Sequence, residues 1–302
     1  MTKPSLHVPA GRQGPGPMPA RLIDELDLVV ARRTAGALPG DRRAAGVGAG
    51  TELAQLRPYE LGDDVRHIDP AATARTREPH VRVHVPERTL TTWIVLDISP
   101  SMAFGTANRL KSDVAEGVTL VLARLAVRRA GRVALVTFGA GGSRLLRPRA
   151  SKPGVMAVRR ALGEGLAADG VSEPAGLAHA LDQLRKVATQ PGLVAIISDF
   201  RDQRGWMSSL GALGARHSVL AIEVRDNREG GVPAAGHLAL VDPETGERVE
   251  VDTSRRAVRE AFARIEAEGR AQIARELRRL RVEHVVLSTD EDWLDTLGRT
   301  LQ

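Results

Sequence analysis

The stretch Thr91-Thr-Trp-Ile-Val-Leu-Asp-Ile-Ser-Pro-Ser-Met102 decides the fold class of this chain. Residues 93–96 form a short apolar run rich in β-branched side chains, which is typical of a strand buried on both faces of a parallel sheet. Asp97 follows this run directly, and Ser99 and Ser101 follow it at alternate positions. The pattern therefore puts Asp-x-Ser-x-Ser at the carboxyl end of a central strand, where open α/β sheets carry their ligand sites.

Two interpretations of this motif are open. One carboxylate and two hydroxyl groups are hard oxygen ligands, which suit Mg²⁺ or Mn²⁺ better than a soft metal. Since side chains two residues apart can turn to the same side of a tight loop, Asp97, Ser99 and Ser101 predict a metal site. The alternative is a strand-to-helix turn in which Asp97 or a serine caps the helix that follows. The surrounding sequence favours the metal.

The composition narrows the class of protein. The 302 residues are enough for one large α/β domain and a smaller appendage, and with only 3% aromatic residues the core must be aliphatic. The chain contains no cysteine, which excludes disulfides, zinc–thiolate sites and cysteine nucleophiles and fits a reducing compartment. No apolar run has the length of a membrane span, and the first residues lack a signal-peptide core. We therefore expect a cytoplasmic protein.

The formal net charge of +6 comes almost entirely from arginine. Such a balance raises the possibility of arginine-mediated nucleic-acid binding. However, the arginines are interleaved with acidic residues, and aromatic side chains for base stacking are nearly absent. A solvated arginine-rich surface is the favoured interpretation.

The chain divides into three parts by composition. Residues 1–19 are rich in Pro and Gly and are predicted to be disordered. Residues 20–88 hold an amphipathic helix at 20–32, a Gly- and Ala-rich loop at 34–50 and a small strand-containing module. Residues 89–302 form the main domain.

The module contains a loop dense in charge at residues 56–69. Asp63, Asp64 and Asp69 are candidates for a second acidic site. The favoured interpretation is structural, with these carboxylates capping turns and pairing with the arginines at 57, 66 and 75. His67 is expected to pack or to form hydrogen bonds, because no second histidine lies at a ligand spacing. Residues 81–85 alternate as a half-buried strand does.

Strands and helices alternate through the main domain. Strands are expected at 93–96, 132–138, 143–147, 192–198, 218–224 and 282–287, with a hairpin at 236–251. Helices are expected at 108–130, 153–166, 173–189, 206–216, 254–280 and 292–301. This order predicts a doubly wound, mostly parallel sheet of the Rossmann type with right-handed crossovers. Asp199 ends its strand as Asp97 ends its own, so we expect the two carboxylates to face each other across one crevice.

Several motifs of the chain, taken together, resemble a known family. Asp97-Ile-Ser-Pro-Ser101 resembles the first motif of the metal-ion-dependent adhesion site in von Willebrand factor A domains, and Asp199 in Ile-Ile-Ser-Asp-Phe matches a later aspartate of that site. The order of Tyr59-Glu-Leu-Gly-Asp-Asp-Val-Arg-His-Ile-Asp69, Leu96-Asp-Ile-Ser-Pro-Ser-Met102, Ser198-Asp-Phe200 and Val241-Asp-Pro-Glu-Thr-Gly246 is similar to domain-of-unknown-function family 58. The resemblance runs from about residue 53 to the C-terminus. It implies a von Willebrand factor A-like main domain after a small N-terminal module.

The chain departs from the family patterns at two positions. Ala175 stands where the adhesion site has a threonine, and Ser172, three residues earlier, is the substitute ligand. Pro70 stands where many family members have tryptophan. The resemblance thus implies a metal site of Asp97, Ser99, Ser101, Asp199 and Ser172 that binds Mg²⁺ weakly in the isolated protein.

The leading functional hypothesis is a non-enzymatic protein-interaction module. Its metal would accept an acidic side chain from a partner, and the family resemblance implies an adaptor role beside a MoxR-type AAA+ ATPase. An alternative is a Mg-dependent hydrolase or phosphatase at Asp97, Ser99 and Ser101. Against it, no histidine lies in a triad motif, and the chain lacks a Gly-x-Ser-x-Gly elbow and a phosphate-binding loop. Nucleic-acid binding is the second alternative.

Overall fold

The computed structural model describes residues 52–85, 90–105, 109–171, 173, 175–201 and 205–300, without the side chains of residues 52–55 and 83–85. The predicted disorder of residues 1–19, the helix at 20–32 and the candidate ligand Ser172 lie outside the described residues. The chain divides into two compact units, residues 41–89 and the remainder.

The smaller unit is built on a two-stranded antiparallel sheet. Strand β1 (Glu52–Pro58) pairs with β2 (His80–Val85), and between them lie a short 3-10 helix, η1 (Val65–His67), and helix α2 (Pro70–Thr76). The proline at the first position of α2 favours the start of a helix, because that position has no intrahelical N–H bond to lose. The alternating strand predicted at 81–85 is present; η1 lies in the segment predicted as loop, and α2, directly after that segment, was not predicted.

The larger unit contains a six-stranded sheet in the order β10-β7-β6-β3-β4-β5. Its strands are β3 (Thr91–Asp97), β4 (Arg132–Phe138), β5 (Arg144–Ala150), β6 (Leu193–Ser198), β7 (Ser218–Arg225) and β10 (Glu283–Ser288). All neighbours are parallel except β5, which pairs antiparallel with β4 at one edge. The predicted doubly wound, mostly parallel fold is confirmed.

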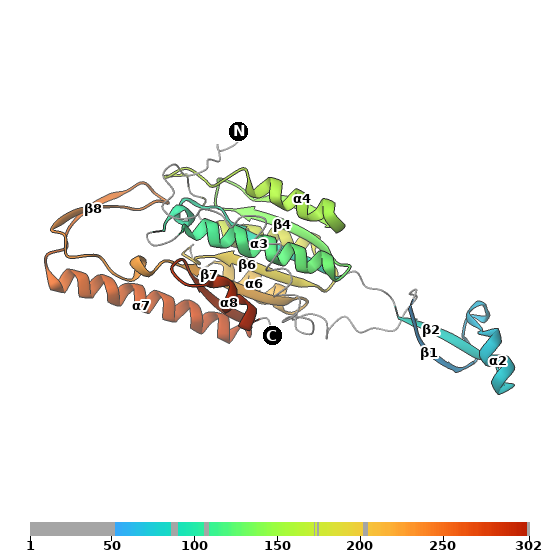
Figure 1. Ribbon diagram of the computed structural model, residues 1–302. Helices are drawn as coiled ribbons and strands as arrows, with labels where there is room; N and C mark the ends of the chain where they lie inside the picture. Colours follow the sequence, from blue (N-terminus) through green and yellow to red (C-terminus); the bar gives the residue numbers. More distant parts are fainter. Residues whose placement is uncertain are drawn as a thin grey trace. The chain divides into compact units, whose positions relative to one another are not determined.

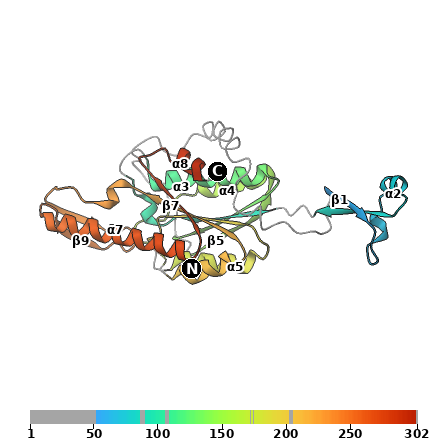
Figure 2. The same cartoon turned by 90° about the horizontal axis from the view of Figure 1, so that it is seen from below.

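Helices cover both faces of this sheet (Figures 1 and 2). One face packs against α3 (Lys111–Arg128), α4 (Ser151–Leu162) and α8 (Trp293–Thr300), and the other against α5 (Gly176–Val187), α6 (Trp206–Gly214) and α7 (Arg256–Arg279). The short 3-10 helices η2 (Pro100–Ala103) and η3 (Asn227–Gly230) lie in loops. A separate hairpin of β8 (His237–Val241) and β9 (Arg248–Asp252) precedes α7.

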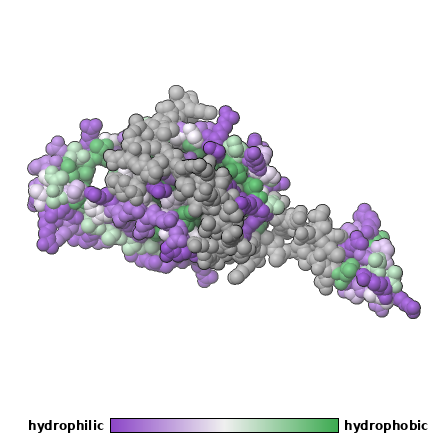
Figure 3. Space-filling view, in the orientation of Figure 1, coloured by the Kyte–Doolittle hydropathy of each residue, from purple (hydrophilic) through white to green (hydrophobic). Residues whose placement is uncertain are grey.

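The described part of the chain contains no helix that is both long and apolar enough to cross a membrane. Helix α7 has the length but not the composition, since its sequence alternates arginine and glutamate with apolar residues. Figure 3 shows hydrophilic residues over much of the described surface in that view.

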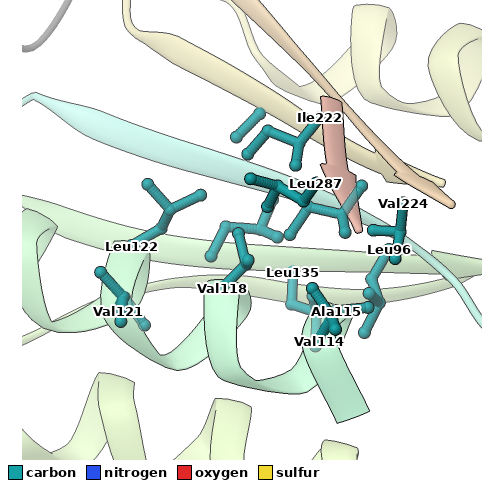
Figure 4. Close-up of a cluster of buried hydrophobic side chains, with 14 of the residues drawn as sticks. Leu96, Val114, Ala115, Val118, Val121, Leu122, Leu135, Ile222, Val224 and Leu287 are labelled. Atoms are coloured by element: carbon teal, nitrogen blue, oxygen red, sulfur yellow. The ribbon is translucent and has the colours of Figure 1, made fainter. Parts of the chain in front are cut away.

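Alternate residues of β3 enter two different cores. Ile94 and Leu96 pack in the cluster that includes Val114 and Val118 of α3, and Figure 4 shows Leu96 lying with these helix residues. Trp93 and Val95 pack in the cluster on the opposite face, with α5 and α6. A strand buried on both sides must be apolar throughout, which explains the uninterrupted run in the sequence.

The register of the central strands brings two carboxylates to one edge. Strand β3 pairs with β6 so that Leu96 lies opposite Ile197. Asp97 is the last residue of β3, and Asp199 directly follows the last residue of β6. The predicted central position of β3 beside β6 is confirmed. The candidate site therefore lies at the carboxyl edge of the sheet, between these two strands.

Candidate functional site

Asp97 ends the central strand and shapes the loop that follows. Its carboxylate is 4% exposed, and its Oδ1 accepts a hydrogen bond from the backbone N–H of Ser99 at 2.9 Å. The N–H of Ile98 still donates to the Phe138 carbonyl of β4 at 2.9 Å, so the chain leaves the sheet just after Asp97. The aspartate thus holds the loop in a tight turn at the sheet edge.

The two serines of the motif lie side by side. Ser99 and Ser101 are buried, and their hydroxyl oxygens are 3.0 Å apart. Gly139, after β4, permits this packing: its φ is +94°, and a Cβ there would lie 2.7 Å from the Cβ of Ser99. Side chains two residues apart therefore point to the same place, as the spacing predicted.

The motif does not cap the following helix. Helix α3 begins at Lys111, and the backbone N–H of Leu110 before it donates to Asp113 Oδ2 at 3.0 Å. Ser99 precedes η2, but its side chain forms no capping hydrogen bond there. Of the two interpretations of Asp-x-Ser-x-Ser, the helix cap is not what the structure contains.

The end of β6 joins the same site. Ser198 Oγ donates to Asp97 Oδ2 at 2.6 Å, so both oxygens of the Asp97 carboxylate accept hydrogen bonds. Asp199, next in the chain, is 5% exposed and accepts a hydrogen bond from the backbone N–H of Arg201 at 3.1 Å. The ends of β3 and β6 are thus joined by a direct hydrogen bond from Ser198 to Asp97.

The sequence interpretation missed Lys111. This first residue of α3 is fully buried, and its Nζ lies 2.6 Å from Asp199 Oδ2 and 2.6 Å from Glu229 Oε1. A cation at a helix N-terminus is unfavourable towards the helix dipole, so the position needs compensation from acids. A lysine at a predicted helix start, in a chain that uses arginine almost everywhere else, was the available signal.

Charged side chains extend from Lys111 to helix α7. Glu229 of η3 also lies 3.6 Å from Arg201 Nε and 4.0 Å from Arg270 of α7. Arg201 forms two hydrogen bonds to Glu266 of α7, at 2.8 and 3.3 Å. The site edge is therefore tied by ion pairs to the long helix beside it.

Burial and charge set the acidities in the site. Burial, and then the negative charge of Asp199, raise the pKa of Asp97 to about 7. Burial also acts to raise the pKa of Asp199, but the charge and hydrogen bond of Lys111 outweigh it, so that pKa is lowered. Burial acts to lower the pKa of Lys111, and Asp199 and Glu229 together reverse this effect. Asp199 is thus compensated by an ammonium group, whereas Asp97 is not.

A further acidic residue reaches the loop from the β8–β9 hairpin. The backbone N–H of Ser101 donates to Glu244 Oε1 at 3.2 Å, across 143 positions of sequence. The segment 241–246 was noted in the sequence only as a family motif. Nothing in its local pattern indicated where its glutamate would lie.

The family model described as "Protein of unknown function DUF58" matches residues 55–272 of the chain. The chain belongs to the DUF58 family. The resemblance stated from the four sequence motifs is thereby confirmed, and the matched range includes parts of both units.

Known members of similar sequence are themselves uncharacterized. An uncharacterized protein of Mycobacterium tuberculosis is 38% identical over 288 residues, covering 94% of this chain and 89% of its own length. An uncharacterized protein of Mycobacterium avium is 42% identical over 123 residues, covering 41% of this chain and 72% of its own. These relatives support the family assignment and add no activity to it.

Solved structures resemble the fold at low sequence identity. An aerotolerance-related membrane protein from Bacteroides fragilis has a TM-score of 0.43 and 14% identity, covering 70% of this chain and 98% of its own. A von Willebrand factor type A structure from Catenulispora acidiphila has a TM-score of 0.39 and 13% identity, covering 70% of this chain and 42% of its own. The likeness concerns the fold alone.

The oxygen groups of this DUF58 site fit a hard divalent cation in kind. In the described residues no group of three or more His, Cys, Asp or Glu side chains could hold a metal ion, so a cation here would need the serine hydroxyls. Ser99, Ser101 and the uncompensated carboxylate of Asp97 offer oxygens of the type that Mg²⁺ takes. Asp199 fits less well as a ligand, because Lys111 already contacts one of its oxygens.

The remaining predicted ligand positions differ in what the structure shows. Ser172 lies outside the described residues. Ala175 precedes α5 with a left-handed backbone (φ +61°). A Cβ on the adjacent Gly176 would lie 3.5 Å from the N of Gly139, the residue that packs against Ser99. The start of α5 is therefore near the serine loop, while Ala175 itself offers only a methyl group.

The three carboxylates of the small unit have structural contacts. Asp63 forms two hydrogen bonds to Arg57, at 2.7 and 2.9 Å, and Asp64 caps η1 and pairs with Arg66. Asp69 caps α2 through the N–H of Ala72. These contacts agree with the structural interpretation of the acidic loop.

One predicted pairing in that loop is wrong. Asp69 pairs with Arg82 of β2 at 2.6 Å, while Arg75 Nε donates to the Ala71 carbonyl of its own helix. The reason is that α2 directs Arg75 away from Asp69, the N-cap of the helix, whereas β2 brings Arg82 beside Asp69. His67 is exposed at the end of η1, where its charge acts on Asp64.

Proposed function

We propose that this DUF58 chain is a non-enzymatic protein-interaction module whose binding centre is the cluster of polar side chains at the ends of β3 and β6. The observation that carries the proposal is the convergence of Asp97, Ser99, Ser101 and Asp199 at one sheet edge, with the serine hydroxyls 3.0 Å apart. Carboxyl edges of parallel strands are where open α/β sheets bind ligands. Such a cluster suits recognition of a polar group on another protein.

The proposed cofactor is Mg²⁺ or Mn²⁺, held by the hydroxyls of Ser99 and Ser101 and by the carboxylate of Asp97. When bound, the cation would supply positive charge and an open position for a partner's oxygen ligand. Asp199 would act from farther away, since the Lys111 ammonium already neutralises much of its charge. This arrangement supports weak metal binding in the isolated protein.

The proposed partner is a protein that presents an acidic side chain. A cation beside two hydroxyls attracts a carboxylate, and the Ser101 N–H already donates to one. A MoxR-type AAA+ ATPase stays a prediction from the family resemblance, as does a cytoplasmic location from the cysteine-free sequence.

The geometry gives little support to catalysis at the serines. A serine nucleophile needs a base within hydrogen-bond reach. The Ser99 and Ser101 hydroxyls lie within hydrogen-bond distance of each other, and the Asp97 carboxylate already accepts hydrogen bonds from Ser198 Oγ and the Ser99 N–H. We therefore keep the non-enzymatic assignment as part of the proposal.

A calorimetric titration of Mg²⁺ tests the metal. Ser101→Ala removes a proposed ligand, and we expect it to weaken binding at least tenfold, roughly the least that loss of even an outer partner costs. Ser143→Ala is the matched control, because Ser143 Oγ donates to Gln183 away from the proposed ligands. Asp97→Ala should abolish the heat. Equal binding by wild type, Ser101→Ala and Asp97→Ala would remove the cation from the proposal.

A further inference from the structure

The hairpin β8–β9 reaches back to the serine loop. Its turn, residues 242–247, makes two hydrogen bonds there: the Ser101 N–H donates to Glu244 Oε1 at 3.2 Å, and the Gly170 N–H donates to the Pro243 carbonyl at 2.9 Å. The residue 170 loop is itself bonded to the site, since the Ala167 N–H donates to the Ile98 carbonyl at 2.8 Å. In Figure 1 the β8 hairpin, in orange, arches from the start of α7 towards this loop.

The turn presents Glu244 in a fixed conformation. Asp242 Oδ1 accepts the Glu244 N–H at 2.8 Å, and the Asp242 carbonyl accepts the Gly246 N–H at 2.8 Å. Gly246 has a φ of +72°, which glycine adopts without strain. The glutamate is thus partly buried against the loop while its neighbours Thr245 and Glu247 are exposed.

The strands of the hairpin lie outside the six-stranded sheet. Strand β8 pairs with β9, and their apolar residues Val241 and Val249 are 47% and 53% exposed. The base is fixed by Thr253, whose N–H and hydroxyl both donate to the Gly236 carbonyl at 2.7 Å. A two-stranded ribbon in water is marginally stable by itself, so the tip contacts contribute to holding it on the site.

We propose that Glu244 is a built-in ligand of the serine loop, and that the hairpin covers the binding centre until a partner's carboxylate displaces it. This inference rests on the proposed function of that centre. A chain that carries its own carboxylate in the partner's place binds a free partner only in proportion to the fraction of molecules that are open. The hairpin therefore lowers the apparent affinity for acidic partners and sets a threshold for binding.

The test uses the full chain and two matched variants. Glu244→Ala removes the carboxylate that contacts Ser101, and Glu247→Ala removes an exposed carboxylate from the same turn. Hydrogen exchange of the Ser101 and Gly170 amides reports closure of the hairpin. Binding of N-acetyl-glutamate amide, followed by the Ser101 amide resonance with and without Mg²⁺, reports the site, with N-acetyl-glutamine amide as the uncharged probe.

We expect Glu244→Ala to speed exchange of the Ser101 and Gly170 amides. We also expect it to raise affinity for the acidic probe about tenfold, which corresponds to a hairpin that covers the site in roughly nine wild-type molecules of ten. Glu247→Ala should match wild type in both measurements. Unchanged exchange in Glu244→Ala overturns the built-in ligand, even if the probe binds. Faster exchange with no acidic-probe binding in any variant overturns the proposed function and, with it, the regulatory role of Glu244.

Discussion

At the scale of single residues, the site is governed by which buried charge has a partner. Lys111 balances Asp199 and Glu229, each at 2.6 Å, whereas Asp97 is held by neutral donors. A buried ion pair contributes little net stability but becomes costly when one member is removed. We therefore regard Lys111 as the residue that keeps the acidic end of β6 folded when no cation is bound.

Ala175 offers a direct test of the vacant ligand position. We expect Ala175→Asn to increase Mg²⁺ affinity, because asparagine supplies an oxygen and tolerates the left-handed backbone at φ +61°. Ala175→Thr supplies an oxygen too, but its β-branch is strained in that region. Ala175→Gly is the control, expected to raise the free energy of unfolding by about 0.5–1 kcal/mol without changing metal binding. If the Ala175→Asn variant binds Mg²⁺ no better than the Ala175→Gly variant, residue 175 is not a ligand position.

His217 should make the fold sensitive to acid. Its side chain is 2% exposed, Nε2 donates to the Ala188 carbonyl at 3.1 Å, and burial holds its pKa below the usual value. Because the folded state resists protonation, this contribution to stability is complete above pH about 6.5 and is lost as the pH falls below it, at up to about 1.4 kcal/mol per pH unit.

Denaturant unfolding of wild type and His217→Gln between pH 7 and pH 5 measures how much stability each protein loses on acidification. The glutamine amide can still donate to Ala188 but does not titrate. We expect the wild type to lose more stability on acidification than the variant, and parallel losses would show that other groups control acid unfolding.

At the scale of elements, helix α3 is fitted closely to α8 at one point. A Cβ on Gly117 would lie 2.5 Å from the Trp293 ring, which is 1% exposed. Helix propensity favours alanine over glycine by about 1 kcal/mol, yet overpacking a rigid ring costs about 1–3 kcal/mol. Packing therefore outweighs propensity at this position.

We expect Gly117→Ala to lower the free energy of unfolding, measured by chemical denaturation. Gly214→Ala near the end of α6 is a control, since a Cβ there would meet no atom within 4 Å. The double variant Gly117→Ala/Trp293→Leu should recover part of the loss that Trp293→Leu alone suffers, because the two changes share one space. A stabilising effect of Gly117→Ala alone would show that α8 moves aside without cost.

At the scale of the whole molecule, the surface carries less unpaired positive charge than the number of arginines suggests, because several arginines are paired with acidic residues. Arginines pair with acids on several elements: Arg256 with Glu260 at 2.6 Å, Arg201 with Glu266 at 2.8 Å and Arg225 with Glu223. An exposed pair such as Arg256 with Glu260 contributes little to stability, but all three pairs reduce the field that would attract a polyanion.

We therefore expect weak retention on heparin, with elution below about 0.15 M salt, where the screening length is about 8 Å. Elution only at much higher salt, together with DNA affinity that falls steeply with salt, would instead support nucleic-acid binding through the arginines.

Much of the fold could be predicted from the sequence. The runs at 93–96 and 192–198 are apolar at every position, and only strands covered on both faces need that, so their central places followed from composition alone. The edge strand near residues 143–147 and the long helix α7 were also predicted, with ends shifted by one to three residues. The start of α5 shifted from residue 173 to Gly176 because Ala175 adopts a left-handed backbone.

The sequence by itself determined the sheet and the loop of Asp97, Ser99 and Ser101, because spacing within one short segment fixes which side chains point together. Only the tertiary structure decided what surrounds them. Lys111 meets Asp199 across 88 positions and Glu244 meets Ser101 across 143. Such contacts depend on how a helix start and a hairpin tip pack against the sheet edge. A hydrophobic pattern records that a residue is buried but not which distant charge it meets there.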